Sequence, residues 1–265
     1  MPETPEWRIF DKAPFFMSFS QTTGFLLIFA LVTTGCDSPR QAKTAPGDDE
    51  AQDVNRAYYK DGKLETEIPM RNGKKHGIAR SYYPNGKLRL ELEYRFGKKE
   101  GLSKRYYESG ALYQTTEYKQ DMFDGIQTKY RENGNKISEQ PYHLDLPCLG
   151  LKEYLLDGSP RQHYPTIVIT PVDELLTKGE YRLMFSTSDK KRKVKYYRGK
   201  LSAAGCLTEA LEPVFFDEDK GVGVITFYLR PGEFYMEELN VIARIETANN
   251  NFYVTQRTYH LSIDN

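Results

Sequence analysis

The sequence predicts an all-β protein in which a ribbon of stacked β-hairpins is followed by a β-sandwich. Three observations lead to this fold class. Glycine and tyrosine recur at one constant spacing between residues 58 and 164, and segments between them alternate apolar and polar side chains. After Pro165, about seven strand-like segments are separated by turn residues. Alternation with a period of two is typical of strands with one buried face, and a constant longer period is typical of stacked repeats.

Residues 1–36 have the pattern of an export signal. An apolar run from Phe25 to Val32 is too short to span a bilayer, because a spanning helix needs about 20 apolar residues. It leads into the stretch TTGC, which ends at Cys36 and resembles the lipobox of bacterial lipoproteins. The resemblance implies cleavage before Cys36, which would then carry a diacylglycerol. We expect a lipoprotein anchored in the bacterial cell envelope, on the periplasmic or outer-membrane face, whether translation starts at Met1 or Met17.

Residues 37–57 are polar and charged and contain Pro39 and Pro46. Because such a segment buries little apolar surface, it is expected to be a flexible linker between the anchor and the folded part. The other two cysteines, Cys148 and Cys206, would lie in an oxidising compartment and could pair. Two separate buried thiols are an equally good reading of the sequence.

Residues 58–164 contain the repeat. Its most regular positions are a turn glycine and a tyrosine shortly before it, each with a constant 24-residue period: Gly62, Gly86, Gly110, Gly134 and Gly158, with Tyr58, Tyr82, Tyr106, Tyr130 and Tyr154. Dipeptides such as Asn85-Gly86 tolerate positive φ and are strong signals for a tight turn between two strands.

The strand after each turn alternates. In LRLELEY, Leu90, Leu92 and Tyr94 fall on one face, and Glu91 and Glu93 fall on the other. A single hairpin is marginally stable in water, whereas stacked hairpins join their apolar faces into one ribbon. The repeat is therefore expected to be a continuous sheet.

The stretches YYPNGKL, EYRFGKKEG and RYYESGAL resemble the bacterial MORN-variant repeat, whose hallmark is Tyr-Tyr-x-Asn-Gly-Lys-Leu followed by Gly-Lys-x-x-Gly. The resemblance extends over residues 58–164 and implies a hairpin scaffold. Proteins with such repeats are often labelled as antitoxin components of toxin–antitoxin systems, so an antitoxin or immunity-like protein that neutralises a toxin is the alternative function.

Residues 165–265 are expected to form an immunoglobulin-like sandwich. Seven segments read as strands: TIVIT, EYRLMFSTS, VKYYRGKL, EPVFFDE, GVITFYLR, LNVIARIET and FYVTQRTYHLSI. Seven short strands in about a hundred residues fit that fold, although its Cys…Trp…Cys hallmark is missing and a partly open barrel is the alternative. The stretch VDELL is expected to form one helical turn.

No catalytic motif is found in the sequence. It contains no Gly-x-Ser-x-Gly, His-Glu-x-x-His or Cys-x-x-Cys, and its four histidines are scattered. Lys and Arg together number 37, as do Asp and Glu, so no overall charge points to nucleic acid. We expect no enzyme activity, no cofactor, no metal site and no nucleic-acid binding. The basic stretch from Asp189 to Lys200 is expected to be a solvated hairpin tip, with contact to anionic lipid or glycan as the alternative.

A row of tyrosines is the predicted binding surface. Tyr59, Tyr83 and Tyr107 share the period of the repeat and are expected to face away from the leucine-rich side, whereas Tyr82 and Tyr106 are expected to pack. Tyrosine offers a large contact area at a low entropic cost. The predicted function is thus a lipid-anchored, non-catalytic interaction or structural module that binds a protein or glycan partner.

Overall fold

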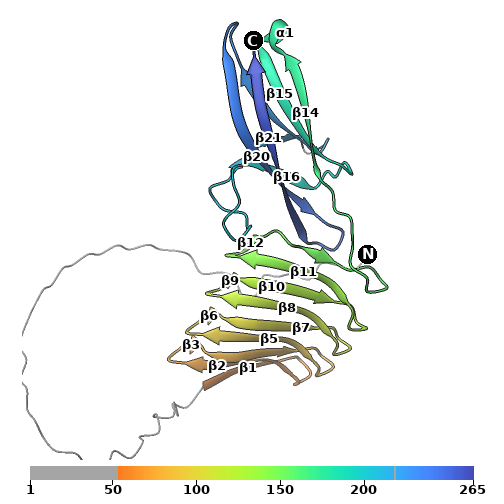
Figure 1. The fold of residues 1–265 in the computed structure, drawn as a ribbon. Coiled ribbons are helices and arrows are strands. Elements are labelled where there is room, and N and C mark those ends of the chain that lie inside the picture. Colours follow the sequence, from red (N-terminus) through yellow and green to blue (C-terminus); the bar gives the residue numbers. More distant parts are fainter. Residues whose placement is uncertain (1–52, 218) are drawn as a thin grey trace, which may run out of the picture. The chain divides into compact units, whose positions relative to one another are not determined.

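The computed structural model describes residues 53–217 and 219–265, whose regular structure consists almost entirely of β-strands (Figure 1). The predicted all-β fold class is confirmed. The one helix in the described ranges, α1 (Leu175–Lys178), is a single turn that includes only the last two residues of the stretch VDELL, and Gly179 ends it with a φ of 70°. No helix in these ranges is long and apolar enough to cross a membrane.

The repeat forms one 13-stranded antiparallel sheet, so the predicted hairpin ribbon is confirmed (Figure 1). The main path is β1-β2-β4-β5-β7-β8-β10-β11-β12, in which neighbours along the chain are neighbours in the sheet. β3, β6 and β9 pair with the long strand before them, and β13 pairs with β11. The strands are β1 (Asp53–Tyr58), β2 (Leu64–Arg71), β3 (Lys74–Lys75), β4 (Gly77–Tyr82), β5 (Leu88–Arg95), β6 (Lys98–Lys99), β7 (Gly101–Tyr106), β8 (Leu112–Lys119), β9 (Met122–Phe123), β10 (Gly125–Tyr130), β11 (Lys136–His143), β12 (Leu146–Pro147) and β13 (Lys152–Glu153).

β1 begins at Asp53, inside the range 37–57 that the composition assigns to a linker. It pairs with β2 in a register that runs from Asp53 opposite Met70 to Tyr58 opposite Leu64. Its side chains are mostly exposed, so it lacks the apolar alternation by which a half-buried strand is recognised. Backbone pairing with the edge of the repeat sheet explains the strand.

The five turn glycines all have positive φ, between 82° and 95°. In the second turn, the amide of Gly86 donates to the carbonyl of Tyr83, and the amide of Lys87 donates to the side chain of Asn85. The same two bonds recur in the other four turns, where Asp, Ser or Asn takes the place of Asn85. Glycine adopts this backbone conformation without steric cost, which explains its strict spacing.

One face of the ribbon, here called the packed face, carries the leucine-rich row. Leu92 and Tyr94 are buried there together with Ala79, and Leu90 packs against them, as the alternation predicts. The intervening Glu93 is exposed. The opposite side of the sheet, here called the charged face, carries the acidic and basic side chains of the same strands.

Two four-stranded sheets follow the ribbon. One has the order β14-β15-β19-β18 and the other β17-β16-β20-β21. In immunoglobulin lettering these correspond to A-B-E-D and to C-F-G with an extra edge strand beside C. The predicted immunoglobulin-like sandwich is confirmed. Its strands are β14 (Ile167–Glu174), β15 (Glu180–Thr187), β16 (Val194–Arg198), β17 (Glu212–Pro213), β18 (Phe215–Asp217), β19 (Val222–Tyr228), β20 (Phe234–Glu246) and β21 (Phe252–Asp264).

The sandwich core joins the inner faces of both sheets. Leu183 and Phe185 from one sheet and Tyr196 and Val241 from the other are nearly inaccessible to solvent. The segment EPVFFDE, read as one strand, divides between the two sheets as β17 and β18, with the buried Val214 between them. The amide of Val214 donates to the carbonyl of Tyr196 at 3.0 Å, so the chain crosses the edge of the sandwich here.

Candidate interaction surface

The predicted tyrosine row is engaged inside the ribbon. Tyr59, Tyr83 and Tyr107 are half-buried, and each hydroxyl donates to a backbone carbonyl of the next hairpin. These bonds measure 2.6, 2.7 and 2.7 Å, and their acceptors are Tyr82, Tyr106 and Tyr130. These hydrogen bonds connect successive hairpins, so the three tyrosines stabilise the ribbon. Partner binding by these three residues stays a prediction.

Arg131 occupies the equivalent position in the fourth hairpin. Its guanidinium donates to the carbonyl of Tyr154 at 3.1 Å, and this acceptor has the same sequence separation from its donor as the tyrosine acceptors have. A residue of different shape thus makes the same contact between hairpins. This equivalence supports a structural requirement for a donor at this position.

The other tyrosine row does not face the leucine-rich side. The hydroxyl of Tyr82 donates to Glu67 at 2.8 Å, and the hydroxyl of Tyr154 donates to Glu139. Both carboxylates belong to the charged face, so the expectation that Tyr82 packs with the leucines is wrong. A register shift between Ser81 and Tyr82 in the pairing of β4 with β5 breaks the simple alternation at this point.

Two histidines that the sequence places in adjoining repeats do not form a site together. His143 lies 2.8 Å from a carboxylate oxygen of Asp124, whereas the carbonyl of His163 accepts a bond from Arg161. Within the described ranges, no three His, Cys, Asp or Glu side chains are grouped so that they could hold a metal ion. Cys36 lies outside the described residues.

A stripe of exposed aliphatic side chains crosses the charged face. Ile78, Leu102 and Ile126 are 41, 44 and 46% exposed and form what is here called the aliphatic stripe. They lie opposite Glu93, Glu117 and Pro141 in the paired strands, which places them in register on successive hairpins. Because one strand lies between each of them and the next, their spacing is two inter-strand distances, or about 10 Å. Sequence reasoning missed them, although the regular recurrence of the dipeptides GI, GL and GI was a usable signal.

Beside the stripe, charges of opposite sign alternate from strand to strand. This charged row consists of Arg56, Glu67, Arg80, Glu91 and Lys104, one from each successive strand of the main path. Successive members lie 4.0, 3.7, 3.2 and 4.0 Å apart. Opposite charges placed directly across neighbouring strands stabilise a sheet modestly, and here each carboxylate also holds two cations in position. In the described ranges, strands β1 to β8 make their main contacts with other strands of the same sheet.

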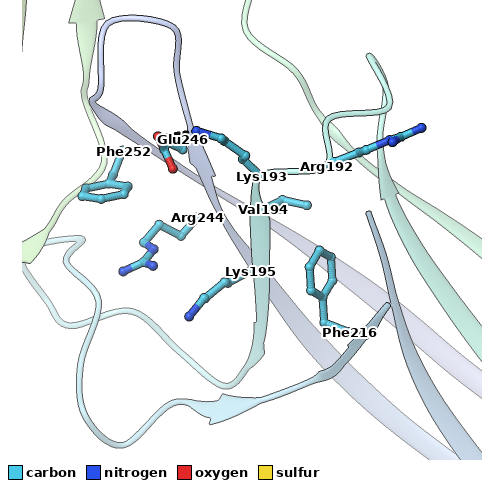
Figure 2. Close-up of a pocket in the computed structure, with 8 residues that line it drawn as sticks. All are labelled: Arg192, Lys193, Val194, Lys195, Phe216, Arg244, Glu246 and Phe252. Atoms are coloured by element: carbon cyan, nitrogen blue, oxygen red, sulfur yellow. Dashed lines mark hydrogen bonds and ion pairs between the residues drawn. The ribbon is translucent and has the colours of Figure 1, made fainter. Parts of the chain in front are cut away.

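The second surface feature lies on the sandwich. A hollow of about 290 Å³, here called the basic hollow, is lined by residues of β16, β18, β20 and β21 and of the loop before β16 (Figure 2). Its lining residues are Arg192, Lys193, Val194, Lys195, Phe216, Arg244, Glu246 and Phe252. Four of these eight side chains are cationic and one is anionic, so the hollow has a local excess of positive charge.

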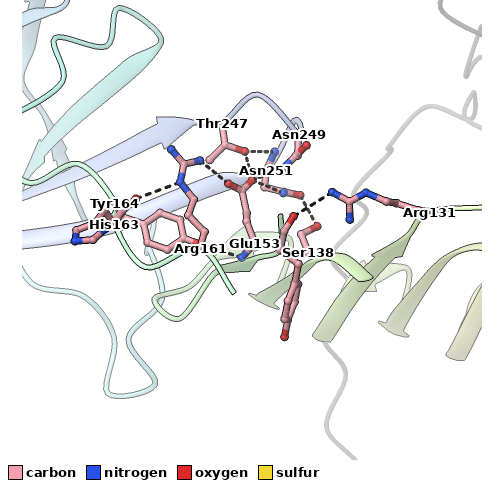
Figure 3. Close-up of polar contacts among 10 residues, drawn as sticks. Arg131, Ser138, Glu153, Arg161, His163, Tyr164, Thr247, Asn249 and Asn251 are labelled. Carbon is pink, nitrogen blue, oxygen red and sulfur yellow. Dashed lines mark hydrogen bonds and ion pairs between the residues drawn. The ribbon is translucent and has the colours of Figure 1, made fainter. Parts of the chain in front are cut away.

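The ribbon and the sandwich meet at a buried carboxylate (Figure 3). Glu153, whose side chain is 2% exposed, accepts bonds from Thr247, Asn249 and Asn251 in the turn between β20 and β21, at 2.6, 3.1 and 2.9 Å. Arg161 adds an ion pair at 3.0 Å. Burial by itself raises the pKa of Glu153, but these hydrogen bonds outweigh it and hold the pKa below its ordinary value.

A half-buried lysine completes this junction. Lys129 donates to the carbonyls of Asn249 and Asn250 and to the side chain of Asn251, at 2.9, 3.0 and 2.9 Å, which satisfies all three of its protons. Burial lowers the pKa of Lys129, and the negative charge of Glu153, which raises it, offsets only part of this effect.

The repeat changes its chemistry where it approaches this turn. At one position of the packed face, Leu92 is replaced by Thr116 in the next unit and by Gln140 in the unit after that. The Gln140 side chain is completely buried and accepts the amide of Phe252 at 3.0 Å. The polar residues of the last hairpins therefore serve the sandwich turn rather than an apolar core.

A disulfide also links the two parts. Cys148 follows β12 and is bonded to Cys206 in the loop between β16 and β17. The same two residues form a short antiparallel bridge, with Leu149 donating to Gly205 at 2.9 Å. Of the two alternatives that the sequence left open, the structure shows the paired one.

A sheet of repeated hairpins with a charged face, joined to a β-sandwich, defines an all-β repeat protein in the described part of the chain. The comparisons agree with the repeat. The family model described as MORN repeat variant matches residues 75–95, 99–120 and 123–143, which correspond to three successive units. A search of curated proteins gave no match. MORN repeats are in general modules for interaction with proteins or membranes.

Proposed function

We propose that this chain is a non-catalytic interaction protein, anchored in the bacterial cell envelope by a lipid on Cys36, and that the charged face of its ribbon binds a protein partner. The partner would carry apolar side chains for the aliphatic stripe and basic side chains for the neighbouring carboxylates. The sandwich, held to the last hairpins, would keep the ribbon in a fixed orientation for that partner.

The observation that carries the proposal is the aliphatic stripe. Three branched side chains, each more than two fifths exposed, stand in register on a face where their neighbours are charged. Isolated exposed apolar residues are ordinary, but an ordered row with a polar border is typical of an interaction site. Burying such side chains contributes about 25 cal/mol for each Å² of apolar surface removed from water.

The carboxylates beside the aliphatic stripe indicate which side chains a partner would carry. Glu93 lies directly opposite Ile78, and Glu117 lies directly opposite Leu102, so carboxylates stand between the aliphatic side chains. A carboxylate that is covered by a partner without a cation loses solvation, which costs free energy. Lysine or arginine on the partner would offset that cost and fix the register.

Two features support the envelope location. The apolar run that leads into Cys36 has the length of a signal-peptide core. The bond between Cys148 and Cys206 is of the kind that persists in oxidising compartments and is rare in the bacterial cytosol.

Replacing Cys36 by serine is expected to abolish lipid attachment and release the protein from the membrane fraction. Serine has no thiol to accept the diacylglycerol, whereas the folded part is untouched by the change. Incorporation of radiolabelled palmitate, followed by membrane fractionation, measures the effect, and Cys206→Ser serves as a control that should keep its label. Equal labelling of the wild type and Cys36→Ser would rule out the anchor.

Changing Ile78, Leu102 and Ile126 together to serine is expected to weaken capture of the partner at least tenfold, with the fold retained. Contact energy concentrates in a few buried side chains of an interface, at about 2 kcal/mol or more for each of them. Partners would be identified by mass spectrometry after pull-down with the wild type. The purified partner would then be titrated against each variant, with circular dichroism as the test of folding.

A matched control replaces three aliphatic side chains elsewhere that are at least as exposed as those of the stripe. Leu144, Leu156 and Leu176 are also exposed aliphatic residues, but they lie outside the stripe. Their triple serine variant should bind like the wild type. Equal affinity of both triple variants would show that recognition lies elsewhere, and a toxin as the captured protein would make the antitoxin alternative the specific function.

A further inference from the structure

The basic hollow on the sandwich contains an arrangement of like charges that a sheet normally avoids. Lys195 on β16 lies directly opposite Arg244 on β20 in the paired register. Figure 2 shows their side chains extending to the same side of the two strands. Like charges at directly opposed positions destabilise a sheet, so an anion between them would turn a repulsive pair into a binding pair.

Among the described residues, no acidic side chain pairs with either cation. In the ranges that the structure describes, no carboxylate forms an ion pair with Lys195, Arg244 or Arg192. The one acidic side chain that lines the hollow, Glu246, lies 3.0 Å from Lys193 and is occupied by it. The net charge of the lining is therefore three positive, from four cations and one anion.

Aromatic rings give the hollow an apolar wall. The guanidinium of Arg244 stacks over the ring of Phe252, with 4.7 Å between its central carbon and the ring centroid. Stacking holds the guanidinium plane and leaves its N–H edge to donate two parallel bonds to a carboxylate or phosphate. Phe216 also lines the hollow, but its partly buried ring packs against the sandwich core beside Tyr196.

We propose that the basic hollow binds a carboxylate-bearing sugar residue of an acidic polysaccharide. The carboxylate would sit between Lys195 and Arg244, and the apolar face of the sugar ring would lie against an aromatic ring. The hollow's volume of about 290 Å³ is at the lower end for ligand pockets, which fits a short saccharide rather than a large ligand. This inference does not depend on the partner of the aliphatic stripe.

The surroundings of the hollow favour a sugar acid over the phosphate of a lipid headgroup. Glu246, although paired with Lys193, has carboxylate oxygens that can accept hydrogen bonds from sugar hydroxyls. The adjoining loop has the sequence SDKKRK over residues 188–193, with no apolar side chain that could enter a bilayer. The aromatic rings instead line the hollow, where a sugar ring would contact them.

The test is a calorimetric titration of the full chain with trigalacturonate, with a neutral trisaccharide, maltotriose, as the control ligand. We expect trigalacturonate to bind, maltotriose to bind at least tenfold more weakly, and rising salt to weaken the former. The double variant Lys195→Gln/Arg244→Gln should lose at least tenfold in affinity for trigalacturonate. Absence of trigalacturonate binding to the wild type would overturn the proposal.

A second double variant distinguishes binding in the hollow from nonspecific attraction of the ligand to positive charge. Lys190 and Lys191 belong to the same loop but do not line the hollow, so Lys190→Gln/Lys191→Gln removes equal charge and should change affinity less than twofold. Equal losses in the two double variants would refute a defined site. Lys195→Gln alone, at an exposed side chain, provides the same test if loss of Arg244 disturbs folding.

Lipid vesicles test whether the hollow binds the phosphate of a lipid headgroup instead of a sugar carboxylate. Binding of the wild type to phosphatidylglycerol vesicles, lost in Lys195→Gln/Arg244→Gln while trigalacturonate fails to bind, would assign the hollow to lipid phosphate and overturn the sugar proposal. Binding of trigalacturonate by the wild type, together with vesicle binding that the double variant does not change, supports the sugar proposal.

Discussion

Replacing Glu153 by leucine is expected to lower the free energy of unfolding by about 3–5 kcal/mol. The side chain is 2% exposed, and its carboxylate accepts bonds from three side chains of one turn and pairs with Arg161. Leucine fills the space but leaves these donors without an acceptor in a buried place, and an unsatisfied buried donor costs more than a satisfied one contributes. Chemical denaturation followed by circular dichroism measures the change.

The same experiment has an internal control in an exposed acid. Glu209 lies in the loop before β17, and Glu209→Leu should change stability by less than about 0.5 kcal/mol. Glu153→Gln retains one acceptor oxygen and should fall between the wild type and the leucine variant. If Glu153→Leu were as stable as Glu209→Leu, the junction would not hold the sandwich to the ribbon.

The pH dependence follows from the direction of the shift. Because the pKa of Glu153 is held below its ordinary value of 4.5 in the folded protein, the carboxylate contributes stability that is fully present above that value. This contribution is lost as the pH falls through the lowered pKa of the folded state. Glu153→Gln has no proton to gain here, so its stability should fall less steeply on acidification than that of the wild type.

The ribbon could be predicted from the sequence because its structure is local and repeated. A hairpin places its turn and both strands within a single repeat unit, so each positional requirement, such as positive φ at Gly86, recurs in the sequence. The packed face could be read for the same reason, from the alternation at Leu90, Leu92 and Tyr94. The sandwich strands were also recognisable, since their cores are runs of branched and aromatic residues.

What could not be predicted is set by contacts between distant parts of the chain. Gln140 and Glu153 are polar residues within the repeat, yet they bond to a turn roughly a hundred residues further on. The tyrosine faces were misread at Tyr82 because a register shift, invisible in the residue pattern, changes the direction of the side chain. The aliphatic stripe recurs in the sequence after Gly77 and Gly101, but the exposure of Ile78 and Leu102 depends on the pairing of the strands and not on this spacing alone.

Removing the disulfide, by Cys148→Ala together with Cys206→Ala, is expected to lower the free energy of unfolding by about 4 kcal/mol on the chain-entropy model. The two cysteines are separated by 58 residues, so the bond closes a long loop and restricts the unfolded chain strongly. In denaturant titrations, a reducing agent should bring the wild type toward the double variant and leave the double variant unchanged. No effect of the reducing agent on the wild type would mean that the thiols are not paired in the purified protein.

The disulfide and Glu153 act on the same junction, which makes their effects dependent on each other. The bond fixes Cys148, at the end of the ribbon, to the sandwich loop, while Glu153 holds the turn between β20 and β21 a few residues further along. Without the bond, the junction can open before the rest unfolds, so the Glu153 contacts would stabilise less of the molecule. Glu153→Leu should therefore cost less in the alanine double variant than in the wild type, by about 0.5–3 kcal/mol of coupling. Strict additivity of the two changes would show instead that ribbon and sandwich unfold as one unit whichever link is removed.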